Sequence, residues 1–234
     1  MTIYAFIFAR GGSKGLPRKN VKLLAGKPLI SYSIKIAQET PLIDQVFVST
    51  EDEEIAKVAT ADGATVIHRP TEFATDTCPE WLAWRHAVNY VTDNYGQFEL
   101  FVSLPPTSPL RHVDDVTGAI NLFRSKKKAD TCISVTPANR SPFFNMVKLN
   151  QEGYSELVSK PEVTLTRRQD TSPVFDITTV VYVTRPSFIL NNSSLFDGRV
   201  VSLEVPKVRA VDIDDIYDFQ FAEMLMQFQG NENA

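Results

Sequence analysis

The sequence has few of the residues that crosslink small proteins or bind transition metals. Its 234 residues include only two cysteines, Cys78 and Cys132, which lie far apart and outside any C-x-x-C pair. Three histidines, His68, His86 and His112, are the other candidates for a zinc site with them. Such scattered positions predict neither a disulfide framework nor a zinc centre.

Long apolar runs and an excess of positive charge are also lacking. No hydrophobic segment reaches the roughly 20 residues that span a bilayer, and the N-terminal apolar segment is too short for a signal peptide. The formal net charge of −4 gives no overall positive field that would attract nucleic acid. We therefore expect a cytoplasmic protein that binds neither membranes nor nucleic acid.

Alternating strands and helices are what the first part of the chain does contain. Apolar runs of strand length at residues 4–9, 44–49 and 63–67 alternate with helical periodicity at residues 28–38 and 55–59. A capping-box pattern, Thr50-Glu51-Asp52-Glu53, precedes the second helix. This order predicts right-handed βαβ units and hence an α/β fold with a mainly parallel sheet.

The same alternation continues to the C-terminus, so we expect one domain over residues 1–234 with helices on both faces of the sheet. Thr77-x-x-Glu80 is interpreted as the capping box of a long helix, on which Trp81 and Trp84 anchor the core. Residues 138–166 alternate only weakly and predict a small β-rich excursion with a turn at Glu152-Gly153. The remaining expected strands are 98–103, 131–136, 180–183 and 200–203, and the remaining helices are 113–125 and an amphipathic one at 213–228.

A glycine-rich, cationic loop follows the first strand. Residues 11–15 read Gly-Gly-Ser-Lys-Gly, and Arg10, Lys14, Arg18 and Lys19 place four cations within ten residues. Glycines let the backbone N–H groups approach a ligand closely, so the loop predicts a polyphosphate site. The spacing fits neither the P-loop nor the dinucleotide-binding fingerprint, and a basic surface turn is the alternative.

The loop and the segment after it resemble a known family. The pattern Arg10-x-x-x-Lys14-Gly15-x-x-x-Lys19-Asn20, followed by Leu24-x-Gly26-Lys27-Pro28-Leu29, is similar to the signature of CMP-sugar synthetases, and within them to acylneuraminate (sialic acid type) cytidylyltransferases. The resemblance runs from residue 3 to about residue 228. It implies a Rossmann-like, GT-A-like nucleotidyltransferase fold that joins CTP to an acid sugar.

The resemblance also implies roles for individual residues. Phosphate contacts and catalysis fall to Arg10, Lys14, Lys19, Asp212 and Asp214. Other nucleotide contacts fall to Gly11, Gly12, Ser13, Asn20, Arg69, Asp76 and Thr77. The acid-sugar pocket takes Pro105, Thr107, Ser108, Arg168, Thr178 and Tyr182, with Arg168 as the clamp on the sugar carboxylate.

Two aspartates near the C-terminus are the expected magnesium ligands. Asp212 and Asp214 flank Ile213, and residues two apart in an extended backbone point to the same side. Two carboxylates together with phosphate oxygens and water suit Mg²⁺. Because acids also cap helices, we assign capping to Asp215 and Asp218 and metal binding to Asp212 and Asp214.

Some positions depart from the sialic acid pattern and leave the sugar open. Pro105 stands where those relatives carry glutamine, Thr178-Thr179 replaces Asn-Gly, and Glu80 replaces a small hydroxyl residue. Both a nine-carbon 2-keto-3-deoxy acid sugar and, alternatively, an eight-carbon keto acid or a sugar 1-phosphate fit the pattern. A noncatalytic nucleotide-sugar sensor is a further alternative.

In the resembling family the segment that matches residues 138–166 is a dimerisation arm. The aromatic residues Phe143 and Phe144 fit that role, and an ordinary surface hairpin is the alternative. We accordingly expect a homodimer. For the reaction, we expect attack of the sugar's anomeric hydroxyl on the α-phosphorus, with the proton accepted by Asp212 or by a base held on the metal.

Overall fold

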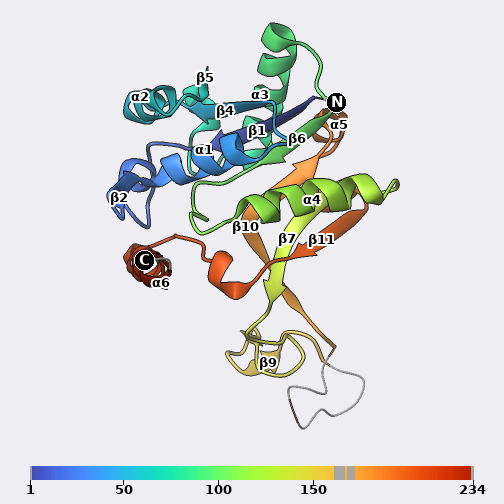
Figure 1. The fold of residues 1–234 in the computed structure, drawn as a ribbon. Coiled ribbons are helices and arrows are strands. Elements are labelled where there is room, and N and C mark those ends of the chain that lie inside the picture. Colours follow the sequence, from blue (N-terminus) through green and yellow to red (C-terminus); the bar gives the residue numbers. More distant parts are fainter. Residues whose placement is uncertain (1, 161–166, 168–171, 233–234) are drawn as a thin grey trace.

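A central seven-stranded sheet organises the computed structural model, which describes residues 2–160, 167 and 172–232 (Figure 1). Its order is β11-β7-β10-β6-β1-β4-β5, and β10 alone runs antiparallel to its neighbours β6 and β7. The strands are β1 (Ile3–Phe8), β4 (Gln45–Thr50), β5 (Thr65–His68), β6 (Leu100–Ser103), β7 (Thr131–Pro137), β10 (Phe175–Thr184) and β11 (Val200–Glu204). The predicted α/β class with a mainly parallel sheet is confirmed.

Helices cover both faces of this sheet. They are α1 (Leu29–Glu39), α2 (Glu53–Ala61), α3 (Glu80–Tyr95), α4 (Val113–Ser125), α5 (Pro186–Asn191) and α6 (Ile216–Glu232). Apolar residues of α1, α2 and α4 pack on one face in a single aliphatic cluster. The other face is aromatic, since Trp84 of α3 lies 5.0 Å from the Phe101 ring and is 4% exposed. The prediction that this tryptophan anchors the core is confirmed.

Two predicted capping boxes are wrong. The N-cap of α2 is Asp52, whose carboxylate accepts hydrogen bonds from the backbone N–H groups of Glu54 and Ile55, both at 3.0 Å. Thr50 instead accepts a hydrogen bond from the Asp52 backbone N–H at 3.1 Å. Helix α3 begins after Pro79 with no side-chain cap, so Thr77 does not cap it.

The last helix begins later than predicted, at Ile216, because two aspartates cap it. Asp215 accepts from the backbone N–H of Tyr217 and of Asp218, and Asp218 accepts from the backbone N–H of Asp214 and of Asp215. The capping roles assigned to these two residues are confirmed. Residues 212–214 therefore lie before the helix, outside any regular element.

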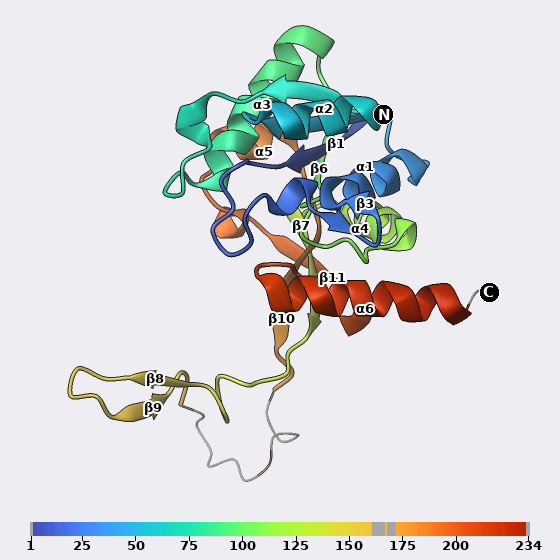
Figure 2. The ribbon, with the colours of Figure 1, turned by 90° about the vertical axis from the view of Figure 1, so that its left-hand side faces the viewer.

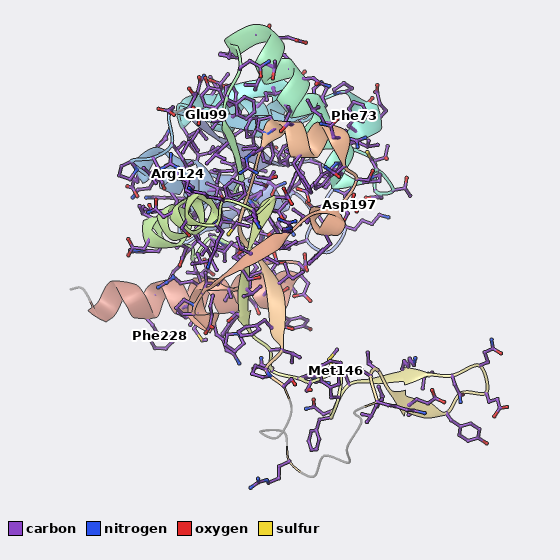
Figure 3. The ribbon with its side chains drawn as sticks, turned by 90° about the vertical axis from the view of Figure 1, so that its right-hand side faces the viewer. Phe73, Glu99, Arg124, Met146, Asp197 and Phe228 are labelled. Carbon is purple, nitrogen blue, oxygen red and sulfur yellow. The ribbon has the colours of Figure 1, made fainter. Side chains whose placement is uncertain are left out.

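The segment between β7 and β10 leaves the main sheet. A short hairpin of β8 (Val147–Leu149) and β9 (Ser155–Leu157) turns through Gly153, whose φ of 86° favours glycine. Figure 2 shows this hairpin standing away from the body, whereas α6 lies along the body and contributes Phe219 and Ala222 to a core cluster with Leu16, Leu24 and Leu29. In Figure 3 the side chains of the hairpin, Met146 among them, are clear of the body. The predicted excursion and its turn are confirmed, although residues 161–166 lie outside the described residues.

Candidate functional site

A cleft of about 480 Å³ opens at the carboxyl ends of the parallel strands β1, β5 and β6, where ligands of such sheets bind. Phe8 at the end of β1, Arg69 after β5 and Pro105 after β6 form parts of its wall. It brings together these predicted residues: Arg10, Ser13, Lys14, Lys19, Asn20, Arg69, Asp76, Pro105, Thr107, Tyr182, Asp212 and Asp214. Segments some 200 residues apart in the chain therefore share one cavity.

The glycine-rich loop lies directly against the acidic segment at residues 212–214. The ammonium group of Lys19 donates a hydrogen bond to the carbonyl oxygen of Ile213 and lies 3.6 Å from a carboxylate oxygen of Asp214. A Cβ at Gly15 would come within 2.3 Å of the Asp214 carbonyl oxygen. Only glycine permits this approach, so the loop and the acids form opposite walls of one site.

Asp212 is the acid held inside the cleft wall. Burial raises the pKa of its carboxyl group, while hydrogen bonding from Thr107 opposes the shift and the neighbouring Asp214 adds to it. Its Oδ1 atom is buried without a hydrogen-bond partner among the described residues. Asp214 is largely exposed at 82% of its side chain. A half-buried carboxylate with one unsatisfied oxygen, beside an exposed carboxylate, is a fitting donor set for a hard divalent cation.

The described residues contain no group of three or more His, Cys, Asp or Glu side chains arranged to hold a metal. A cation at Asp212 and Asp214 would therefore take its other ligands from phosphate and water. Mg²⁺ prefers this arrangement.

Asp76 is the partner of two cations of the glycine-rich loop. Its Oδ1 lies 2.8 Å from the guanidinium of Arg10, and its Oδ2 lies 2.7 Å from the ammonium group of Lys14. These pairs hold the pKa of the Asp76 carboxyl below its usual value, with the hydrogen bond from Lys14 as the largest cause. Asp76 thus lines the cleft as predicted, but it does so as an anion facing cations that were assigned to phosphate.

Glu51, at the end of β4, links the two nucleotide-side loops and was not singled out from the sequence. One carboxylate oxygen accepts the Gly11 backbone N–H at 2.8 Å, and the other accepts from Arg69 at 2.9 Å. Both side chains of this ion pair are largely buried, at 17% and 5% exposed. The position directly after a buried strand was the signal available for it.

Arg18 does not belong to the cationic loop's ligand-facing set. It adopts the left-handed conformation, with φ at 58°, and its guanidinium pairs with Asp52 at 2.5 Å and with Glu54. The hydrogen bonds that Arg18 donates to these two carboxylates raise the pKa of Arg18 and lower that of Asp52. The expectation of four cations around a phosphate is corrected to three, Arg10, Lys14 and Lys19.

Several residues that were predicted to contact the ligand do not line the cleft. Thr178 is buried and donates to Ser134 at 2.8 Å, because a register shift in β10 between Thr178 and Tyr182 turns its side chain into the sheet. Its neighbour Thr179 lines the cleft instead, and its hydroxyl lies 2.6 Å from that of Ser108. Gly11, Gly12, Thr77, Ser108 and Thr178 do not line the cavity.

Arg111 is buried behind the part of the cleft wall that Pro105 and Thr179 form. Its guanidinium donates to the hydroxyl of Ser33 at 2.8 Å, to the carbonyl oxygen of Thr179 at 3.1 Å, and to the carbonyl oxygen of Pro105. Burial lowers the pKa of Arg111 to about 9, with Asp115 and Asp212 opposing the shift, so it stays charged at neutral pH.

A family model described as cytidylyltransferase matches residues 4–228, which is nearly the whole chain and includes both walls of this cleft. The chain belongs to the cytidylyltransferase family. Members transfer a cytidylyl group from CTP, which accounts for a cleft that combines a cationic loop with two carboxylates. The predicted resemblance and the predicted nucleotidyltransferase activity are confirmed.

Individual relatives agree with this assignment. An N-acylneuraminate cytidylyltransferase of Escherichia coli is 30% identical over 96% of this chain and 52% of its own length. A CMP-N,N'-diacetyllegionaminic acid synthase of Legionella pneumophila is 32% identical over 97% of both chains. A solved structure of CMP:2-keto-3-deoxy-manno-octonic acid synthetase complexed with CTP shares the fold, with a TM-score of 0.71 at 16% identity over 98% of this chain and 100% of that one.

In this cytidylyltransferase, Tyr182 and Glu80 both line the cleft. Burial raises the pKa of Tyr182, and the charges of Glu80 and Asp212 add to the shift. Surrounding protein atoms also raise the pKa of the Glu80 carboxyl, although solvent still reaches this residue through the open cleft. Arg168, the predicted carboxylate clamp, lies outside the described residues, and the adjacent Arg167 is exposed. Among the described helices none is long and apolar enough to cross a bilayer.

Proposed function

We propose that this cytidylyltransferase joins CTP to a nonulosonic, sialic-acid-like 2-keto-3-deoxy acid sugar and releases pyrophosphate. The observation that supports this most directly is the shared cleft in which the glycine-rich loop meets Asp212 and Asp214. The names of the two relatives, one acting on an acylneuraminate and one making a CMP-legionaminic acid, support the class of acceptor. Pro105 and Thr179 in the cleft wall leave the particular sugar to be determined.

In the proposed reaction the anomeric hydroxyl of the sugar attacks the α-phosphorus of CTP. A new oxygen–phosphorus bond forms as the bond to the β-phosphate oxygen breaks, and the hydroxyl proton leaves to a base. The chain contributes positioning and charge: Arg10, Lys14 and Lys19 offset negative charge on the phosphates, and Arg69 holds the nucleotide's far end. Tyr182 and Thr179 shape the acceptor end.

Mg²⁺ is the proposed cofactor, with Asp212 and Asp214 as its protein ligands. The unsatisfied Oδ1 of Asp212 is the structural support for this assignment. When bound, the ion would supply positive charge against the triphosphate.

The test is pyrophosphate release with CTP, UTP and GTP, each offered with sialic, legionaminic, pseudaminic, deaminated sialic and 3-deoxy-octulosonic acids. We expect turnover with CTP and a nine-carbon acid. Asp214→Asn should abolish turnover while the thermal unfolding midpoint stays close to that of the wild type, because this side chain is exposed. Turnover only with an eight-carbon acid or a sugar 1-phosphate would refute the proposed acceptor, and CTP binding without any pyrophosphate would indicate a sensor.

We also propose that the protein is a homodimer joined through the excursion. The hairpin exposes Val147, Leu149 and Tyr154 at 60%, 69% and 68%, an apolar surface that water disfavours. A second copy of the chain is the proposed occupant, because α6 exposes further apolar residues to which the hairpin of another copy could bind, including Phe228 at 61% (Figure 3). We place the reaction in the cytoplasm, where CTP is available and where free thiols such as Cys78 and Cys132 persist.

A further inference from the structure

Asp76 lies against the cationic side of the cleft. Its two carboxylate oxygens are divided between Arg10, at 2.8 Å, and Lys14, at 2.7 Å. Both cations lie in the glycine-rich loop, whereas Asp76 lies on the opposite rim between the short 3-10 turn η2 (Thr71–Phe73) and α3. The Asp76 carboxylate therefore links the segment between η2 and α3 to the glycine-rich loop.

The position of Asp76 conflicts with the binding of a polyphosphate. The N–H groups that donate to its oxygens are those that the proposed function assigns to phosphate oxygens. A charged carboxylate beside a triphosphate is also repelled, since like charges within a few ångströms raise the energy of both. The lowered pKa keeps Asp76 negative at neutral pH, so protonation does not relieve this conflict.

The ion pairs of Asp76 with Arg10 and Lys14 can be broken at little cost in free energy. The side chains of Lys14 and Asp76 are 74% and 40% exposed, and ion pairs in that setting contribute little free energy. Around Asp76 the backbone is held by local turn hydrogen bonds, from Ala74 to Thr71 at 3.0 Å and from Cys78 to Thr75 at 3.3 Å. Asp76 can therefore leave the cations without disturbing the sheet.

We propose that Asp76 is an internal competitor of polyphosphate, which pairs with Arg10 and Lys14 in the empty enzyme and gives way when CTP binds. This inference rests on the proposed function. When pyrophosphate is the remaining ligand, return of Asp76 to the same two cations lowers the affinity for that product and favours its release. Asp76 thus sets the balance between capture of CTP and discharge of pyrophosphate.

Direct binding of CTP and of pyrophosphate, measured by calorimetry with Mg²⁺ and without acceptor, tests this. Asp76→Asn keeps the size of the side chain but removes its charge, so both ligands should bind roughly 2- to 30-fold more tightly, the range expected for release from two exposed ion pairs. Under turnover, pyrophosphate should inhibit the variant at correspondingly lower concentrations.

Glu72→Gln is the matched control. Glu72 is exposed in the same rim segment, its substitution changes the net charge equally, and it is not the partner of Arg10 or Lys14 in their ion pairs. Its effect on both affinities should stay within about 2-fold, since a general charge effect at this exposure is weak.

The outcomes separate the inference from the function on which it rests. If the wild type binds CTP and Asp76→Asn binds it equally or more weakly, Asp76 is a nucleotide contact and the competitor role is wrong. Equal tightening by Glu72→Gln would also overturn it. A wild-type protein that binds neither CTP nor pyrophosphate would instead overturn the proposed function.

Discussion

Gly15 is the point at which the two walls of the site lie too close for any side chain. An added Cβ would be 2.3 Å from the carbonyl oxygen of Asp214 and 3.2 Å from its carbonyl carbon. Relaxed carbon–oxygen contacts are about 3.3 Å or longer, so Gly15→Ala must separate the loop from the acidic segment at residues 212–214 by about 1 Å. Because the obstacle is backbone, no side-chain rotation relieves it.

The consequence for activity follows from what each wall carries. Lys14 and Lys19 move with the loop, whereas Asp212 and Asp214 move with the acidic segment. A separation of about 1 Å therefore misaligns the cations with the carboxylates. Misplacement on that scale costs roughly 100-fold in rate, and overpacking costs about 1–3 kcal/mol of stability. We expect kcat/KM for pyrophosphate release to fall roughly 100-fold in Gly15→Ala, with a modest loss in thermal unfolding midpoint.

Gly12→Ala is the control within the same loop. Nothing lies within 4 Å of a Cβ at Gly12, neither glycine has a positive φ, and Gly12 does not line the cleft. Its activity should stay within about 3-fold of the wild type. A Gly15→Ala enzyme that keeps wild-type turnover, or a Gly12→Ala enzyme that loses as much, would refute the reasoning from close approach.

Three further predictions concern the Glu51–Arg69 ion pair, the cap of α2 and the hairpin. Glu51→Gln breaks a buried ion pair, so calorimetry should show CTP binding weakened roughly 10- to 100-fold. Asp52→Ala should lower the free energy of unfolding in urea by about 1 kcal/mol through loss of the α2 cap, whereas Asp52→Asn keeps a capping oxygen and loses only the charge. Since Arg18 lowers the pKa of Asp52, the stability difference between wild type and Asp52→Asn should be full above about pH 4 and vanish as the pH falls through the lower folded-state pKa. Leu149→Asp should shift the protein towards monomer in sedimentation, and an unchanged dimer would exclude the hairpin as the interface.

The fold could be predicted because its signals are local. Apolar runs and helical periodicity mark each element of the βαβ series, and Asp215 and Asp218 cap the start of α6. The direction of β10 was not predictable in the same way, because an apolar run reads alike in parallel and antiparallel pairing. Its register shift was not predictable from the sequence either: it buries Thr178, which the family resemblance assigned to the sugar pocket, and leaves Thr179 in the cleft wall.

The site was only partly predictable because its pairings join distant residues. The motifs and the family resemblance identified many, but not all, of the residues that line the cleft. It did not indicate that Asp76 pairs with Arg10, that Glu51 pairs with Arg69, or that Arg18 turns away. Each of these depends on which loops the sheet order brings side by side, and one carboxylate in a sequence resembles any other.

Arg111 shows how the two unusual acceptor positions are connected. One guanidinium holds the carbonyl oxygens of both Pro105 and Thr179, and Ser33 supports it by also donating to Pro105 at 3.2 Å. Asp212 in turn opposes the lowering of the Arg111 pKa by burial, so this buried cation also interacts with one of the two carboxylates of the cleft. A change of sugar preference therefore requires side chains at Pro105 and Thr179 that fit carbonyl positions already fixed by Arg111. If only one of the two residues is substituted, the other keeps its side chain in the cleft wall. The backbone carbonyl groups of both positions stay where Arg111 holds them.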